Sequence, residues 1–552
     1  MKKTLSWILL SLCLFGVQIC VAQTSNQGSI VGTVSDPNNK VVPGALVTVT
    51  NTETGISRTT TTDDRGDYRM DFLSPANYTI VVERKGFKKA EVSQAVVQVS
   101  VVQRFDVHLL IGEVSEQVTV SSDTSSAINT ENATIGEVVN ERTIQNMPLN
   151  GREFLELSAL TAGAESGNAK NGVFPTKGVA VGFNGARSGY NAYYVDGADS
   201  TDSNFNQLIS SPALDAIKEF RVETSLYSAR YGRAGGGVIN VVTKSGTNQF
   251  HGTLYEFFRN KALDALPYFQ TQSRNETPPY KFNQFGGTIG GPIIKNKTFF
   301  FFSAEFFRQT KPGQLIEGFA PTAKERAGDF TESVNGYTGL PFTLYNPYTQ
   351  QPIASKILPP ELITSVGKKL LDLIPDPNYD DPIFNLRIFR SGQYTQNKYL
   401  IKIDHNFKDG STLNGSFNYG KYDNVAPGLT QFADQNNFDY GKTLALGYTR
   451  TLTRTLVNDA KFNYTWNQNG SKQALSDKNY AKEFGFWMGD QKPDLTGFPR
   501  VQLYTQANRF IQLGGQGPNL HDNRTLYARD EDRKSTRLNS SHQPQSRMPS
   551  SA

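Results

Sequence analysis

The chain has 552 residues, 37% of them apolar, and a formal net charge of +5. Beyond the amino terminus, no stretch is long and apolar enough for a membrane-spanning helix, so any span must be built of strands. Residues 1–22 contribute +2 to the charge and the last twenty residues +4, which leaves −1 for the rest. Nucleic-acid binding therefore has no electrostatic basis.

Residues 1–22 predict a secretory signal peptide. Two lysines precede an apolar run that extends to Val21, and cleavage is expected after Ala22. Lipid attachment at Cys20 is the weaker interpretation, because Ile19 is a poor residue before a lipidated cysteine. Cys13 and Cys20 are the only cysteines of the chain, so the exported protein must depend on sheet pairing and burial instead of disulfides.

Residues 23–112 predict a small β-sandwich, because short apolar runs alternate with turns rich in Asp, Asn, Pro and Gly. The acidic segment Asp63, Asp64 and Asp67 could bind calcium, but a solvated turn is favoured, since no glutamate completes a calcium loop. The tripeptide Arg65-Gly66-Asp67 is likewise interpreted as a turn and not as an adhesion motif. The expected strands are Ser29–Val34, Leu46–Thr50, Tyr68–Phe72, Tyr78–Glu83 and Val96–Leu110.

Residues 113–248 combine strand-like, helical and glycine-rich segments. Helices are expected at Asn140–Asn146 and at Pro212–Phe220, the second with Ser211 as its cap. A glycine run permits close backbone packing but lacks the Gly-Lys-Ser/Thr of a phosphate-binding loop. The glycines are Gly235, Gly236 and Gly237, and the strand-like segment is Glu116, Gln117, Val118, Thr119 and Val120.

Residues 249–530 predict an antiparallel barrel that crosses a membrane. Asn397–Phe407 and Thr412–Tyr422 flank Asp409-Gly410, a dipeptide suited to a tight hairpin turn. After a polar loop at 423–441, a second hairpin follows at Lys442–Thr449 and Val457–Trp466. Each strand has an apolar or aromatic face and a polar face, as an outer-membrane barrel requires. A soluble up-and-down barrel or a large sandwich would also alternate.

Further strands are expected at Gly252–Arg259, Phe282–Ile293 and Thr298–Arg308. Residues 309–393 form a long polar insertion with a helix near Leu362–Ile374, which a barrel would place in an extracellular loop. The fold class expected for the whole chain is mainly β: a transthyretin-like sandwich, an α+β unit, and the first part of a transmembrane antiparallel barrel.

The order of several motifs resembles known families. Gly32-Thr33-Val34, Pro43-Gly44-Ala45 and Thr62–Tyr68 resemble a carboxypeptidase regulatory-like domain, which implies a sandwich without peptidase activity. Other motifs resemble the plug domain of TonB-dependent outer-membrane receptors, and more narrowly their Oar-like group, in which such a sandwich precedes the plug. These motifs are Pro148–Arg152, Tyr194-Val195-Asp196-Gly197, Ile217–Val222 and the glycine run that leads to His251-Gly252.

The resemblance implies energy-coupled import of a nutrient, such as an oligosaccharide, metal chelate or peptide, across the outer membrane of a Gram-negative bacterium. Energy would come from the inner-membrane TonB complex, and Glu116–Val120 is the candidate strand for TonB, by β-augmentation. The segment could equally be the first strand of the plug or the linker that follows the sandwich. Tyr194–Gly197 and the glycines would be structural parts of the plug.

No catalytic, cofactor-binding or metal-binding constellation is expected, because the five histidines are scattered and no catalytic motif occurs. The alternative function is a surface carbohydrate-binding or adhesion protein without transport. A lumen that holds a plug needs about 22 strands, whereas residues 249–530 supply about 8 to 12 at this spacing, so the chain is expected to be a fragment. Residues 531–552 are predicted to be a non-native or disordered basic tail.

Overall fold

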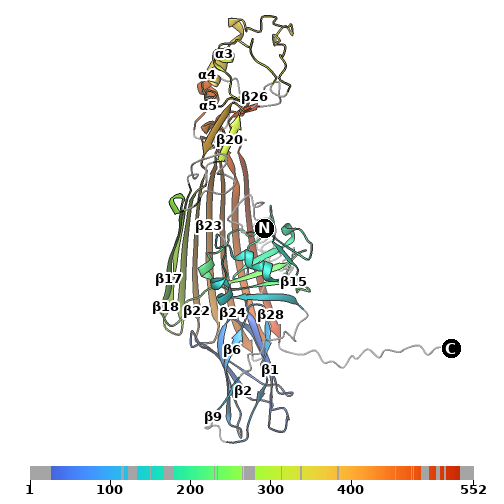
Figure 1. Ribbon diagram of the computed structural model, residues 1–552. Helices are drawn as coiled ribbons and strands as arrows, with labels where there is room; N and C mark the ends of the chain where they lie inside the picture. The colour runs from blue at the N-terminus through green and yellow to red at the C-terminus, as the bar shows by residue number, and fades with distance from the viewer. Residues whose placement is uncertain are drawn as a thin grey trace, which may run out of the picture.

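The computed structural model shows a mainly β protein, as the sequence predicts. A small sandwich lies at one end of a tall sheet, a central unit lies beside that sheet, and a crown of loops and short helices occupies the far end (Figure 1). No helix of the described residues has the length and apolar character needed to cross a bilayer. The structure describes residues 26–112, 117–121, 134–149, 151–166, 179–228, 231–232, 234–263, 265, 280–311, 314–335, 338–381, 384–453, 456–473, 475–476, 478–485, 497–504, 510–514 and 518–534.

The sandwich consists of two sheets packed around aliphatic side chains such as Ile30, Val47 and Ile80. One sheet has the strand order β4-β1-β7 with β8 beside β1, and the other has the order β3-β2-β5-β6-β9. The strands are β1 (Gly28–Ser35), β2 (Leu46–Asn51), β3 (Ser57–Thr61), β4 (Asp67–Leu73), β5 (Ala76–Glu83), β6 (Lys89–Val97), β7 (Val102–Arg104), β8 (Val107–His108) and β9 (Gln117–Ser121).

One expected strand of the sandwich was wrong, and one strand was not predicted. Val96–Leu110 is not one strand, because a turn at residues 98–101 with Ser100 at φ +55° ends β6 and redirects the chain into the other sheet. The edge strand β3 was missed, since its sequence Ser-Arg-Thr-Thr-Thr carries no apolar alternation. The turn at Asp63 is confirmed: its Oδ1 accepts the backbone N–H groups of Arg65 and Asp67.

The central unit is built on a five-stranded sheet of order β10-β15-β16-β13-β14. Its core contains Phe154, Phe183 and Phe220. The elements are β10 (Ile135–Asn140), α2 (Glu141–Asn146), η1 (Phe154–Leu160), β11 (Ala164–Ser166), β12 (Val181–Phe183), η4 (Ser188–Tyr190), β13 (Ala192–Val195), β14 (Ala198–Asp199), η5 (Leu214–Ala216), β15 (Ile217–Ser225) and β16 (Val238–Thr243).

Of the two helices expected in this unit, only the first is correct. Asn140 caps α2 through a hydrogen bond from the N–H of Thr143 to its side chain. Pro212–Phe220 is not a helix: one 3-10 turn leads directly into β15, which pairs with β10 and β16 on its two sides. Ser211 does not cap a helix, and its hydroxyl donates to Glu153 instead. Pairing on both edges therefore overrides the local helical signal.

The tall sheet, called the wall below, has eight strands in the order β17-β18-β19-β22-β23-β24-β25-β28, all antiparallel. In the described part of the chain its outer strands, β17 and β28, do not pair with each other. The strands are β17 (His251–Asn260), β18 (Lys281–Ile294), β19 (Thr298–Thr310), β22 (Gln393–Asn406), β23 (Thr412–Ala426), β24 (Gln435–Thr453), β25 (Leu456–Gln473) and β28 (Asn519–Lys534).

The predicted hairpins of the wall are confirmed, but their strands are longer than expected. Gly410 takes φ +80° in the β22–β23 turn. The polar loop expected at 423–441 shrinks to 427–434, because β23 and β24 continue through residues rich in Asn, Asp and Gln that show no apolar alternation. Likewise β28 ends at Lys534, four residues past the predicted boundary at 530.

The crown has a small apolar core of its own, which includes Leu370, Tyr480 and Phe498. The helix expected near Leu362–Ile374 is present in shorter form as α4, with Thr364 as its cap. The elements are β20 (Gln314–Gly318), α3 (Ala323–Arg326), η8 (Pro360–Leu362), α4 (Ser365–Leu371), β21 (Leu386–Arg390), η9 (Gln431–Ala433), α5 (Tyr480–Phe484), β26 (Val501–Tyr504) and β27 (Phe510–Leu513).

Candidate functional site

The two faces of the wall have the reverse polarity of a soluble sheet. Its outer face exposes large apolar side chains, whereas polar and charged side chains are buried on its inner face, toward the central unit. A bilayer, not water, suits such an outer face. The outer set includes Leu254, Ile289, Phe302, Ile401, Ile403, Leu413, Leu446, Phe462 and Leu526, and the inner set includes Gln284, Glu305, Gln396, Lys398, Lys402, Asn418, Asp459, Lys461 and Asn463.

The predicted motif Tyr194-Val195-Asp196-Gly197 forms a hairpin at the edge of the central sheet. Val195 pairs with Ala198, so Asp196 and Gly197 alone make the turn, with φ of +49° and +82°. Two positive φ values match the turn type that follows strand twist, for which Asp-Gly is a preferred sequence. Asp196 accepts hydrogen bonds from the N–H (3.0 Å) and the hydroxyl (2.6 Å) of Thr243, which attaches the turn to β16.

This turn also makes a polar contact between the central unit and the wall. Lys402 of β22 places Nζ 3.1 Å from Asp196 Oδ1, and both side chains are almost completely buried, at 8% and 4% exposed. The same ammonium donates to the backbone oxygen of Thr243, at 3.1 Å. These two desolvated charges satisfy each other and fix the position of the central unit against the wall. Removing either side chain leaves the charge of the other buried and unpaired.

Neutral hydrogen bonds extend the same interface along the inner face. Asn418 Nδ2 donates to the backbone oxygen of Ser210 at 2.9 Å, and Asn463 Nδ2 donates to that of Gly197 at 3.4 Å. An interface of hydrogen bonds and ion pairs can separate into water at lower cost than an apolar core, because water replaces its partners.

The glycine run directly precedes β16, and its backbone lies against the side chains of neighbouring segments. A Cβ atom built on Gly237 would lie 2.4 Å from the Phe183 ring, and one on Gly236 would lie 2.6 Å from Asn191 Oδ1. Gly235 is less confined, with 3.4 Å to the nearest atom of Tyr190. These positions contribute to packing inside the central unit.

Arg152, at the end of the predicted motif Pro148–Arg152, connects the central unit to the first wall strand. It forms an ion pair with Asp215, and its guanidinium lies 4.7 Å from the ring centre of Tyr255 and 4.5 Å from that of Phe257. Cation–π contacts of this kind are stronger where water is excluded. The backbone of Arg152 has φ +57°.

The sandwich is attached to the central unit through the 98–101 turn. The N–H of Val99 donates to Glu219 Oε1 at 2.5 Å, and Asn240 Nδ2 donates to Ser100 Oγ at 2.9 Å. Burial raises the pKa of Glu219 to about 7, although the Val99 hydrogen bond and nearby Lys218 and Arg221 act in the opposite direction. Elsewhere on this interface Lys218 pairs with Glu53 at 3.0 Å.

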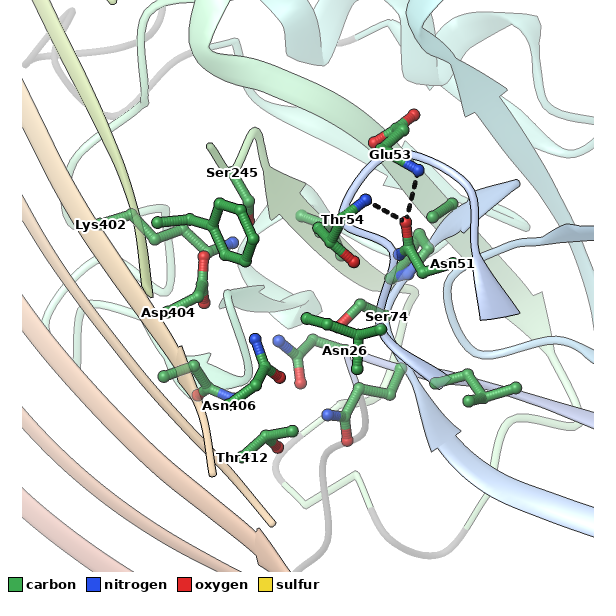
Figure 2. Close-up of a pocket in the computed structure, with 18 of the residues that line it drawn as sticks. Asn26, Asn51, Glu53, Thr54, Ser74, Ser245, Lys402, Asp404, Asn406 and Thr412 are labelled. Carbon is green, nitrogen blue, oxygen red and sulfur yellow. Dashed lines mark hydrogen bonds between the residues drawn. The ribbon is translucent and has the colours of Figure 1, made fainter. Parts of the chain in front are cut away.

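A cavity of about 140 Å³ lies where the sandwich, the central unit and the wall meet (Figure 2). Asn51 and Thr54 reach it from the sandwich, Ser245 from the central unit, and Lys402 and Asp404 from the wall. Within the described residues, Asp404 Oδ2 and Thr54 Oγ1 are buried without a hydrogen-bond partner. The polar groups that line this cavity are suited to bind water.

The remaining predicted residues lie apart from this interface. Glu116 is outside the described residues, whereas Gln117–Val120 belong to β9, which pairs in parallel with β6. No group of three potential metal ligands occurs in the part of the chain that the structure describes. Sequence reasoning did not single out Lys402. It placed Asn418 and Lys461 on the polar faces of their strands but could not identify their partners.

Comparison with known proteins gives matches to both ends of the chain. A model of the outer membrane beta barrel domain matches residues 242–536, and one of the carboxypeptidase regulatory-like domain matches residues 29–110. The TonB-dependent transporter Oar of Myxococcus xanthus is 31% identical over 309 residues, which are 52% of this chain and 27% of that protein. The chain thus spans about a quarter of the length of this curated relative.

Solved structures similar to the chain include a transporter and a receptor. The outer membrane transporter YddB from Escherichia coli is 9% identical, with 72% of this chain and 45% of that chain covered and a TM-score of 0.45. The siderophore receptor PirA from Acinetobacter baumannii is 14% identical, with 73% of this chain and 55% of that chain covered and a TM-score of 0.30.

Proposed function

Since this chain belongs to the outer membrane beta barrel domain family and is related to a TonB-dependent transporter, we propose that it acts in energy-coupled uptake of a nutrient into the periplasm. The nutrient would be an oligosaccharide, a metal chelate or a peptide. The wall would cross the outer membrane of a Gram-negative bacterium. The plug, assigned to residues 113–248 from the sequence, would be the central unit from β10 to β16 and would close the lumen, whereas β9 within that range belongs to the sandwich sheet.

The observation that carries this proposal is the buried polar interface between wall and plug. A sheet whose inner face is only a structural core would be apolar, yet here Lys402, Asn418 and Asn463 bond to the central unit. Such contacts can open and close again in water. The outer membrane holds no ATP or ion gradient, so the energy for opening would come from the inner-membrane TonB complex, which would bind Glu116–Val120 by β-augmentation.

The test is uptake by cells that produce the chain, supplied in turn with labelled oligosaccharides, metal chelates and peptides. The proposal predicts that one class enters the periplasm, and that a protonophore or loss of TonB stops entry while surface binding persists. If the label stays on the surface in energised cells for every class, the transport proposal is refuted.

The alternative is a surface carbohydrate-binding or adhesion protein, which the separately folded crown with its own core favours. A protein of this kind would not need the plug. Ligand binding that is independent of TonB and unchanged after deletion of residues 113–248 would select the alternative.

A further inference from the structure

Strand β9, which contains four of the five residues of the candidate TonB strand, is part of the sandwich. It pairs in parallel with β6 over five residues, from Lys89↔Gln117 to Ser93↔Ser121. It is the terminal strand of its sheet, whose order is β3-β2-β5-β6-β9. Among the described residues, no strand pairs with the outer side of β9.

The two edges of this sheet differ. At the β3 edge, Arg58 Nη1 donates to the backbone oxygens of Asp71 (2.9 Å) and Phe72 (3.2 Å) in β4, which connects that edge to the other sheet. The β9 edge has the sequence Gln-Val-Thr-Val-Ser, without the charged residue or proline that commonly protects an exposed edge. Unpaired N–H and C=O groups on such a strand are a template for another extended segment.

The path from β9 to the plug is short and continuous. β9 is hydrogen-bonded to β6, β6 ends at Val97, and the N–H of Val99 donates to Glu219 of the central unit. Next to it, Ser100 accepts a hydrogen bond from Asn240. A force applied to β9 along the sheet is therefore transmitted through β6 to these contacts.

We propose that the sandwich presents β9 as a preformed edge, and that an extended strand of the periplasmic TonB protein adds to its outer side while β9 stays paired with β6. This inference rests on the proposed function and specifies its partner surface. Because β6 already holds β9 extended, the partner would not bear the cost of ordering that backbone. Pulling would then load the sandwich and, through Val99, the plug.

A disulfide between β6 and β9 tests this directly. Glu91 and Thr119 are register partners, and the exported chain is expected to contain no other cysteine, so the E91C/T119C variant can be locked by oxidation. The probe is the purified periplasmic carboxy-terminal region of TonB from the same host, added to the full chain in detergent. The expected affinity of the locked protein is within about twofold of the reduced one. The control disulfide is formed in the T48C/T59C variant, between β2 and β3 at the opposite side of the sheet.

A locked E91C/T119C protein that loses tenfold or more in affinity, restored by reduction, would show that β9 must leave β6, and would overturn the inference but not the proposed function. If the parent chain does not bind the TonB region at all, both are overturned. Amide exchange on the parent chain gives a second measurement: residues 89–93 should keep their protection when TonB binds, whereas faster exchange there contradicts the inference.

Discussion

Lys402 and Asp196 are separated by 206 residues in the chain, yet they form a buried ion pair with 3.1 Å between Nζ and Oδ1. The lysine belongs to the wall and the aspartate to the hairpin turn of the central unit, so the pair joins the two parts that must separate if the central unit moves. Its strength therefore sets part of the free-energy cost of separating the central unit from the wall.

Replacing either member of the pair should weaken the attachment of the central unit to the wall. Lys402→Met leaves the Asp196 carboxylate buried with only Thr243 as partner, and we expect it to lower the stability of the interface between the central unit and the wall by about 3 kcal/mol. Amide exchange of residues 192–201 in the detergent-solubilised protein measures this. Lys421→Met, which removes a half-exposed pair with Asp423, is the matched control and should cost less than about 1 kcal/mol.

The double variant K402M/D196N should recover most of the stability that K402M loses. Strictly additive losses of the two single variants would contradict a direct ion pair between Lys402 and Asp196.

The glycine run should respond position by position. Gly237→Ala places a methyl group against the Phe183 ring, and we expect it to destabilise the central unit by about 1–3 kcal/mol. Gly235→Ala, where the nearest atom is at ordinary contact distance, serves as the control and should have a small effect. Protease sensitivity of the central unit at increasing urea concentration measures the difference. Equal effects at the two positions would refute the packing role of Gly237.

The outer face of the wall should tolerate a charged side chain only near the ends of its strands. Leu446→Arg places a guanidinium in the apolar band and should cost about 2–4 kcal/mol, whereas Leu452→Arg, next to the β24–β25 turn, should cost about 0–1 kcal/mol. Urea titration of the protein folded into lipid vesicles gives both values. If both arginines cost the same, the outer face does not lie in a bilayer as described.

Docking of the sandwich should weaken as pH rises toward and beyond 7. The pKa of Glu219 is raised to about 7 when it is buried against Val99, and returns to its ordinary value near 4.5 when the sandwich leaves. The docked state thus binds more protons between these values, so its stability is fully present below pH 4.5 and is lost as pH rises through 7. Amide exchange at Val99 between pH 5 and 8, corrected for intrinsic rates, should show this. Glu219→Gln should abolish the pH dependence of docking. An unchanged pH profile in that variant would show that another titratable group causes the pH dependence.

Local patterns were sufficient for much of the fold and for part of the site. Alternation with a period of two located the wall hairpins around residue 410, because it depends only on neighbours in the chain, and Asp409-Gly410 indicated the turn between β22 and β23. The same approach failed at Pro212–Phe220, where pairing with β10 and β16 decides the conformation, and at 423–441, where polar strands have no hydrophobic signal.

The sequence by itself determined which residues alternate, where tight turns occur and which families the chain resembles, since each of these is encoded within a few consecutive residues or in the order of short motifs. Only the tertiary structure decided that the polar face of the wall is the buried one, that Lys402 meets Asp196, and that β9 joins the sandwich beside β6. The physical reason is that such contacts depend on the relative placement of whole sheets, which is set by their combined packing and hydrogen bonding and is not encoded in any short segment.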